Sequence, residues 1–208
     1  MTKRKRDITL DGLHEQGFVL LPSFIDVPEN VKEGIGRQSK RARAIFGPDR
    51  KRRQCSLYTS AKYMKRFTNL LDHQIKEIIS SERVKSNWIV LHSKKGCRRQ
   101  QAHTDYEPTG GILEVPNEDI PLAAVLALED NTKLVVWPGS IGFDFTDFKE
   151  NDGIELVFNA GDLVVFRGDL VHAGAAYQEE NIRLHCYLDH KDVDRKNNRT
   201  LLVKETYN

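Results

Sequence analysis

The sequence predicts a mainly β fold, an α+β arrangement in which a sandwich or barrel of short strands follows a helical N-terminal part. Two observations support this prediction. Apolar, β-branched runs recur roughly every 8–12 residues through the second half of the chain, and clusters of turn-forming residues separate them. In the last of these runs polar and apolar residues alternate, which is the period of a strand. This spacing is not that of alternating β-α units.

The N-terminal part predicts helices and one entry strand. Leu10 to Phe24 is expected to form a short helix that leads into a strand, and Val31 to Phe46 is expected to be helical. Ala61 to Ser80 keeps an apolar stripe at helical spacing, which predicts a further helix. We expect these helices to buttress the larger sheet of the β domain.

The strands are expected where β-branched and aromatic residues gather between turn signals. The expected strands are 87–93, 122–128, 134–137, 154–158, 163–166, 170–172 and 182–188, with 201–203 as an edge strand. Residues 129–133 and 159–162 are rich in Asp, Asn and Gly or Thr, and are expected to form hairpin turns.

The run from Ile182 to Leu188 places Arg183, His185 and Tyr187 on one face of its strand and apolar residues on the other. A polar face inside a barrel wall is costly unless it lines a site. We therefore expect this face to line the same cavity as His172, and Cys186 to be a thiol in the core.

His103 and Asp105, two residues apart, together with the distant His172, predict a metal centre. Two imidazoles and one carboxylate can occupy one triangular face of an Fe(II) ion and leave the opposite face open for a co-substrate and dioxygen. Taken singly, His103 could satisfy a loop, Asp105 could form a turn, and His172 could be a buried, hydrogen-bonded histidine. A second His-x-Asp pair, His190 and Asp192, lies in a polar stretch with no histidine after it.

Arg183 follows His172 by eleven residues and could supply a fixed cation for the far carboxylate of a 2-oxo acid, because a planar guanidinium offers two parallel donors. It could instead be a structural ion-pair partner. His185 could orient the co-substrate, be an ordinary barrel residue, or replace His172 as the second histidine ligand. The last arrangement would leave no room for the co-substrate between metal ligand and anion clamp.

Two stretches of the sequence resemble the 2-oxoglutarate/Fe(II)-dependent dioxygenases. The run from Leu91 to Asp105, which ends in His-Thr-Asp, resembles the metal-binding segment of these enzymes. The run from Gly161 to Arg183, with its His-Ala-Gly, resembles their second half, and Trp137 to Ser140 resembles their Pro-Gly-Ser turn. The resemblance covers roughly residues 85–190. It is closest to the phytanoyl-CoA hydroxylase-like and prolyl-hydroxylase-like branches.

The resemblance implies a double-stranded β-helix, a jelly-roll or cupin-like barrel, that holds Fe(II) and 2-oxoglutarate. The expected site residues are the iron ligands His103, Asp105 and His172 and the co-substrate contacts Arg183, His185 and Gln100. Arg183 is expected on the C5 carboxylate. The implied reaction hydroxylates or oxidatively demethylates a C–H of an unidentified substrate, consumes dioxygen, and decarboxylates 2-oxoglutarate to succinate.

Four positions separate the chain from particular branches of this superfamily. Ile141 stands where phytanoyl-type relatives usually carry a histidine, and His185 replaces a frequent serine or threonine. Asp189 stands where the DNA-dealkylating branch usually has an arginine, which disfavours base dealkylation. Halogenating relatives replace the metal-binding aspartate by a small residue, so Asp105 favours hydroxylation or demethylation.

Length and composition predict one oxygenase domain over residues 1–208, since 208 residues at 39% hydrophobic can bury a substantial core. Residues 1–84 are expected to be a basic, helix-rich support, 85–190 the barrel, and 191–208 a polar tail. Tyr106 to Ile120, which contains two glycines and two prolines, is the candidate lid over the site.

Three widely spaced cysteines, Cys55, Cys97 and Cys186, argue against a disulfide framework and fit a reducing compartment. No apolar stretch is long enough to span a bilayer and no signal-peptide pattern is present. These features predict an intracellular protein, cytoplasmic or nuclear, that does not act on a membrane. Lys3 to Arg6 is a weak nuclear-targeting candidate.

Charge is unevenly placed along the chain. Residues 1–100 hold 23 Lys and Arg against 10 Asp and Glu, whereas residues 101–208 hold 9 against 20. The segment Arg37 to Arg53 packs eight cations around one acid. It could follow a nucleic-acid backbone or another anionic partner. It could equally be a solvated helix face that pairs with the acidic half.

Two rivals to the oxygenase remain open at this point. One is a non-catalytic nucleic-acid-binding protein on the same barrel, which would use the basic N-terminal half. The other is a cupin-like module that binds metal without oxygenase activity.

Overall fold

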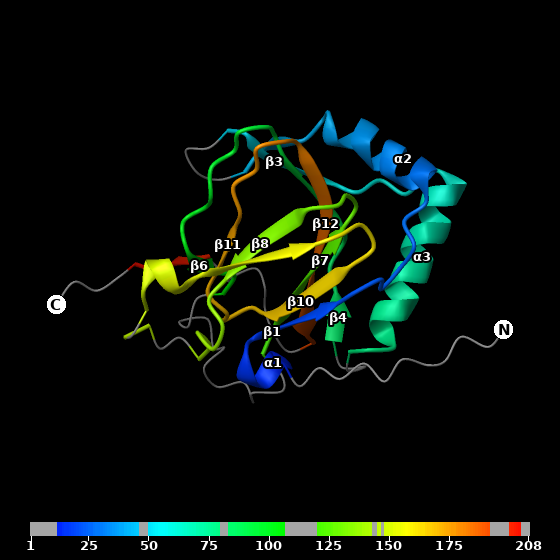
Figure 1. Ribbon diagram of the computed structural model, residues 1–208. Helices are drawn as coiled ribbons and strands as arrows, with labels where there is room; N and C mark the ends of the chain where they lie inside the picture. The colour runs from blue at the N-terminus through cyan, green and yellow to red at the C-terminus, as the bar shows by residue number, and fades with distance from the viewer. Residues whose placement is uncertain are drawn as a thin grey trace.

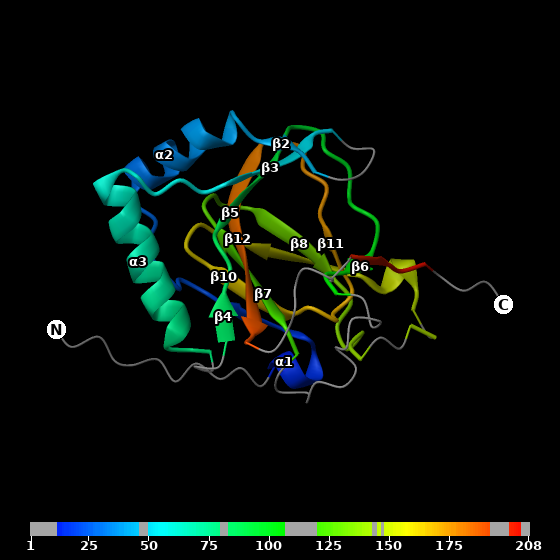
Figure 2. The same cartoon turned by 180° about the vertical axis from the view of Figure 1, so that it is seen from behind.

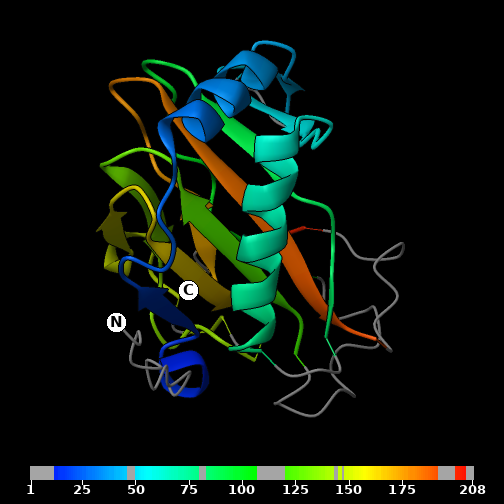
Figure 3. The ribbon, with the colours of Figure 1, turned by 90° about the vertical axis from the view of Figure 1, so that its right-hand side faces the viewer.

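The computed structural model describes residues 12–45, 50–79, 83–106, 120–142, 145–146, 148–191 and 200–204. Two antiparallel sheets pack face to face within these residues, and two helices cover the outer face of the larger sheet (Figures 1 and 3). This is the jelly-roll arrangement of a double-stranded β-helix, so the predicted fold class is confirmed.

The larger sheet has the order β1-β10-β7-β12-β5-β3-β2, and β4 pairs with one end of β12. The strand bounds are β1 (Phe18–Leu21), β10 (Leu163–Arg167), β7 (Leu122–Ala127), β12 (Asn181–His190), β5 (Ile89–Ser93), β3 (Arg52–Ser56), β2 (Arg43–Ala44) and β4 (Arg83–Lys85). Four of these strands come from residues 1–85. The N-terminal part therefore extends the main sheet as well as supporting it.

The smaller sheet has the order β13-β6-β11-β8-β9. Its strands are β13 (Leu201–Leu202), β6 (His103–Thr104), β11 (His172–Gly174), β8 (Thr132–Val136) and β9 (Ile154–Phe158), with a short 3-10 turn, η4 (Glu150–Asp152), before β9. The predicted edge strand near residue 201 is confirmed, because Leu201 pairs with Thr104 and Leu202 with His103.

Three helices complete the described residues: α1 (Gly12–Glu15), α2 (Glu29–Ser39) and α3 (Lys62–Lys76). The apolar stripe of α3 buries Met64, Phe67, Leu71 and Ile75 against the outer face of the larger sheet. Figure 2 shows α2 and α3 together on that side of the molecule.

The predicted helix Val31 to Phe46 was wrong at its C-terminal end. The helix stops at Ser39, and Arg43 and Ala44 pair instead with Gln54 and Arg53 in the hairpin of β2 and β3. Hydrogen bonds to a neighbouring strand outweigh helical propensity here, and propensity alone is a weak guide where tertiary pairing is available. The helix from Ala61 likewise ends at Lys76, before Ser80.

The alternation predicted for β12 is confirmed. Leu184, Cys186 and Leu188 belong to the core beneath the helices. The intervening residues face the smaller sheet, where a second apolar cluster that includes Val125, Val136 and Phe166 fills the space between the sheets. The buried thiol of Cys186 has a raised pKa because of desolvation, as expected of a core residue.

No helix within the described residues combines the length and apolar character that crossing a bilayer requires. The candidate lid falls almost entirely on residues 107–119, which lie outside the described residues. Its two ends, Tyr106 and Ile120, are buried.

Candidate metal centre

The three predicted metal ligands come together between the sheets. His103 lies on β6, Asp105 just after it, and His172 on β11. One nitrogen or oxygen from each lies within 4.8 Å of the others, and they are the only such group of His, Cys, Asp or Glu among the described residues. His172 Nε2 and Asp105 Oδ1 are 3.6 Å apart.

The backbone explains why the two imidazoles meet. His172 and His103 are directly opposed across the antiparallel pair of β11 and β6, so their side chains leave the sheet on the same face. The ring centroids are 4.5 Å apart. The ring of Phe166, on β10 of the larger sheet, lies 4.7 Å from that of His172, centroid to centroid, and limits how the imidazole can turn.

Each imidazole is held by the same local hydrogen bond. His103 Nδ1 lies 2.7 Å from the carbonyl of Gln101, and His172 Nδ1 lies 2.9 Å from the carbonyl of Leu170. A carbonyl can only accept, so both rings carry their proton on Nδ1 and present an Nε2 lone pair. Fixing the tautomer through the outer nitrogen is the usual arrangement for metal-binding histidine.

The charge state also suits a ligand. Burial, and then the neighbouring charge of His172, lowers the pKa of His103 to about 4, and the charge of Arg52 adds to this lowering. The ring is therefore neutral near pH 7, the form that donates an electron pair to a metal. Asp105 supplies the anionic ligand, and its backbone N–H is anchored to the carbonyl of Gly168 at 3.0 Å.

Arg183 lies on the facing strand β12, on the face that looks toward the smaller sheet, and is 5% exposed. Its Nη1 donates to Ser93 Oγ at 3.0 Å and lies 3.4 Å from Asn181 Oδ1. Its guanidinium also stacks over the ring of Tyr177, 5.3 Å from the centroid, and the hydroxyl of Tyr177 is fixed by the backbone of Lys133. No carboxylate is among these contacts, and they hold the guanidinium in one place.

His185 lies two residues from Arg183 on the same face of β12, near enough to Asp105 and His172 to be influenced by their charges. It is 8% exposed and packs edge-on against Tyr187, with ring centroids 4.6 Å apart. Burial lowers its pKa to about 4, opposed by the charge of Asp105 and reinforced by those of His172 and Arg183. It does not belong to the three-residue ligand group, so the geometry favours His172 as the second histidine ligand.

The side chain of Gln100 is engaged with the protein. Its Oε1 accepts from the N–H of Gly174 at 3.0 Å, and its backbone N–H donates to the carbonyl of Gly174. The predicted contact between Gln100 and a co-substrate remains a prediction.

Sequence reasoning missed Arg52 as a residue close to this site. Arg52 opens β3 and is 4% exposed, with Nη1 3.4 Å from Ser93 Oγ. The available signal was strand alternation: Cys55 packs on the helix-covered core, so Arg52, three positions away, must face the other side.

The rest of the basic segment is not one helix face. It spans the last turn of α2 and the hairpin of β2 and β3. Arg37 pairs with Glu33 on the same helix at 3.6 Å, while Arg41, Arg43 and Arg50 are exposed. An anionic partner for residues 37–53 remains a prediction.

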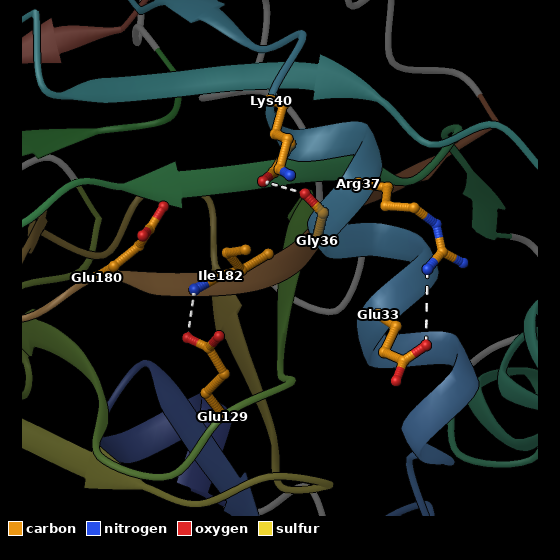
Figure 4. Close-up of a pocket in the computed structure, with 8 residues that line it drawn as sticks. Glu33, Gly36, Arg37, Lys40, Glu129, Glu180 and Ile182 are labelled. Carbon is orange, nitrogen blue, oxygen red and sulfur yellow. Dashed lines mark hydrogen bonds and ion pairs between the residues drawn. The ribbon is translucent and has the colours of Figure 1, made fainter.

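The outer surface carries a separate hollow beside α2. Figure 4 shows it, lined by Glu33 and Arg37 of the helix and by Glu129, Glu180 and Ile182. The backbone N–H of Ile182 donates to Glu129 Oε2 at 2.8 Å. Ile182 packs against the core beneath the helices, so this hollow lies on the face of the larger sheet opposite to the metal ligands.

No family model matches the sequence, and no curated protein matches it. Solved structures do match its fold. HygX from Streptomyces hygroscopicus, with nickel, 2-oxoglutarate and hygromycin B bound, aligns with a TM-score of 0.64 at 12% identity over 89% of this chain and 88% of that one. The non-heme alpha-ketoglutarate-dependent epimerase SnoN from nogalamycin biosynthesis gives 0.62 at 15% over 86% and 79%. A Pseudomonas putida prolyl-4-hydroxylase gives 0.58 at 14% over 87% and 96%.

These similarities establish that the chain has the double-stranded β-helix fold found in 2-oxoglutarate-dependent enzymes. They favour no single branch, because an epimerase and a prolyl hydroxylase match about equally well.

Proposed function

We propose that this chain is an Fe(II)- and 2-oxoglutarate-dependent oxygenase. It would oxidise a C–H bond of its substrate, and so either hydroxylate or demethylate that substrate. The observation that carries the proposal is the cross-strand pair His103 and His172, each with its proton fixed on Nδ1, beside the carboxylate of Asp105. Two neutral imidazoles and one carboxylate are the ligand set of non-haem Fe(II) oxygenases.

The donor set fits Fe(II), and His103, Asp105 and His172 would hold it. Bound iron, with dioxygen and 2-oxoglutarate, would supply the oxidising power for the reaction. The protein's own part is to bind and orient. Arg183 would hold the C5 carboxylate, because its guanidinium is already fixed by Ser93, Asn181 and the ring of Tyr177.

His185 and Tyr187, whose rings pack together, follow Arg183 on the same face of β12 and lead toward its C-terminal end. The neutral ring of His185 can donate or accept one hydrogen bond without adding a charge next to the metal. Asp189, further along the same face, accepts a hydrogen bond from the hydroxyl of Tyr106. We propose that the substrate binds near the C-terminal end of β12, because Arg183, near the N-terminal end, is assigned to the co-substrate.

Anaerobic titration of the Fe(II)-loaded protein with 2-oxoglutarate tests the proposal. We expect a visible charge-transfer band to appear with wild type and with His190→Ala, which alters the other His-x-Asp pair, and to be lost with His103→Ala. Metal binding without such a band, and indifferent to Arg183→Ala, would instead identify a cupin-like metal module.

A screen for succinate release would then assign the substrate. The candidates to include are nucleic acids, protein side chains and small metabolites such as glycosides. Release that depends on both dioxygen and His103 would establish turnover.

A further inference from the structure

Arg52 faces the smaller sheet from β3, which lies next to the edge strand β2 of the larger sheet. In the register of that sheet, Arg52 on β3 is opposite Ser93 on β5, and Ser93 is opposite Asn181 on β12. The three side chains therefore form a row on the face that looks toward the smaller sheet, and all three are buried. Arg183 comes next on that face of β12.

Two guanidinium groups meet at one hydroxyl group in this row. Ser93 Oγ lies 3.0 Å from Nη1 of Arg183 and 3.4 Å from Nη1 of Arg52. Two cations brought together in a buried site repel each other more strongly than they would in water. An anion placed beside Ser93 would be attracted to both, so the arrangement is suited to a carboxylate.

The two terminal nitrogens of the Arg52 guanidinium have different partners. Nη2 donates to the carbonyls of Arg98 and Gly174, each at 2.8 Å, and also to that of Ala175. These contacts immobilise the group, while Nη1 is directed at Ser93. A cation fixed in this way would lose little conformational entropy when it binds an anion.

The guanidinium of Arg52 lies beside Gly174 on β11, and its separation from His172 on that strand matches the length of a 2-oxo diacid. Gly174 is two residues beyond His172, so it lies on the same face of the strand about 7 Å further along. A Cβ atom built on Gly174 would lie 2.5 Å from Nη1 of Arg52. The guanidinium thus occupies the space that a side chain at residue 174 would fill, at a separation from the metal ligand that an extended five-carbon diacid can bridge.

We propose that Arg52 is a second co-substrate-binding arginine, and that Arg52, Ser93 and Arg183 together hold the distal carboxylate of 2-oxoglutarate. This inference rests on the proposed function. It assigns part of the basic N-terminal segment to the interior of the site, and it predicts a strong preference for 2-oxo diacids over 2-oxo monoacids.

The test compares two ligands that differ only in the distal carboxylate. Binding of 2-oxoglutarate and of 2-oxopentanoate to the Mn(II)-loaded protein is measured by calorimetry for wild type, Arg52→Met and the control Arg53→Met. Arg53 carries the same chemical group one position along β3, on the opposite face. Thermal unfolding of each metal-free variant reports on its stability.

We expect Arg52→Met to weaken 2-oxoglutarate binding by at least tenfold and to change 2-oxopentanoate binding by less than twofold, with Arg53→Met close to wild type for both. Equal weakening of both ligands would show that Arg52 serves only the structure, and no change in either would place it outside the pocket; either result overturns the inference. If Arg52→Met fails to fold, Arg52→Lys is read by the same comparison.

Failure of the proposed function gives a different result. A wild-type protein that binds Mn(II) but neither 2-oxo acid would overturn the oxygenase proposal and this inference with it. A wild type that binds 2-oxoglutarate, with the preference over 2-oxopentanoate unchanged in Arg52→Met, would overturn this inference alone.

Discussion

His103 and His172 are directly opposed on adjacent antiparallel strands, with ring centroids 4.5 Å apart. Each ring donates its Nδ1 proton to the carbonyl two residues before it. The same local geometry thus occurs twice, once on each strand, and Asp105 adds the third ligand next to it. Because both histidines sit on paired backbone, the geometry of the centre depends on sheet register rather than on a loop.

Loss of any one ligand should abolish tight metal binding. We expect His103→Ala, Asp105→Ala and His172→Ala each to weaken Mn(II) binding by at least about 100-fold, since changes to outer-shell partners alone commonly cost 10–100-fold. His190→Ala should stay close to wild type. Equilibrium dialysis gives the dissociation constants, and retention of tight binding in His172→Ala with loss in His185→Ala would reverse the ligand assignment.

The metal-free protein should lose stability in acid partly through His185. Its pKa is about 4 in the folded state and about 6.5 in the unfolded state, so between these values the unfolded chain binds more protons. The stability that depends on the neutral ring is therefore present above about pH 6.5 and is lost as the pH falls through 4. The contribution is roughly 3 kcal/mol at most.

Asp189 acts in the opposite sense over the same window. Burial raises its pKa to about 7, so its contribution is lost as the pH rises through that value. Asp189 is present in both wild type and His185→Gln, so its contribution cancels when the two proteins are compared. We expect the free energy of unfolding from urea titrations to fall less steeply between pH 6.5 and 4.5 in the variant; parallel curves would contradict the assignment.

Two substitutions of Tyr177 should distinguish the contribution of its hydroxyl to folding stability from the contribution of its ring to holding Arg183. Tyr177→Phe keeps the ring under the Arg183 guanidinium but removes the hydroxyl that bonds both backbone groups of Lys133. Leaving those groups without this partner should cost roughly 1–3 kcal/mol of unfolding free energy. Affinity for 2-oxoglutarate should stay within about twofold of wild type.

Tyr177→Leu is the paired change, since it removes the aromatic face as well. We expect it to weaken 2-oxoglutarate binding by several-fold more than Tyr177→Phe, because the cation–π contact is worth about 0.5–2 kcal/mol. Equal affinities for the two variants would show that the ring does not hold Arg183.

Gly174 should not tolerate a side chain. A Cβ atom there would lie 2.3 Å from Gln100 Oε1 and 2.5 Å from Arg52 Nη1, so Gly174→Ala must displace both. We expect a loss of roughly 1–3 kcal/mol in unfolding free energy, as in other overpacked sites, and weaker 2-oxoglutarate binding.

Gly36→Ala is the matched control. Gly36 lies inside α2, where an added Cβ atom would have nothing within 4 Å, and alanine favours a helix interior over glycine by about 0.5–1 kcal/mol. The control should therefore raise the melting temperature while Gly174→Ala lowers it. A neutral Gly174→Ala would mean that the surroundings of Gly174 are loosely packed.

The pattern of the sequence predicted His103, Asp105 and His172 as candidate metal ligands, which the structure brings together, and the alternating face of β12. The alternation depends on strand period, which survives any error in the bounds of an element. The end of α2 could not be predicted in this way, because Arg43 and Ala44 leave the helix to pair with β3, and that partner is distant in space until the hairpin forms. The site roles of His185 and Gln100 also stay predictions, since no periodicity says what a buried polar group contacts.

The sequence by itself predicted the class of fold, two histidines and an aspartate as candidate metal ligands, and the strand that carries Arg183. These follow from residue type and local period, which are properties of neighbouring positions in the chain. Only the tertiary structure decided that Arg52 lies beside Ser93 and Arg183, because cross-strand register brings residues 52, 93 and 181 into one row. Register is set by how whole strands pair and by which faces they bury, and a segment read alone carries no record of its partner.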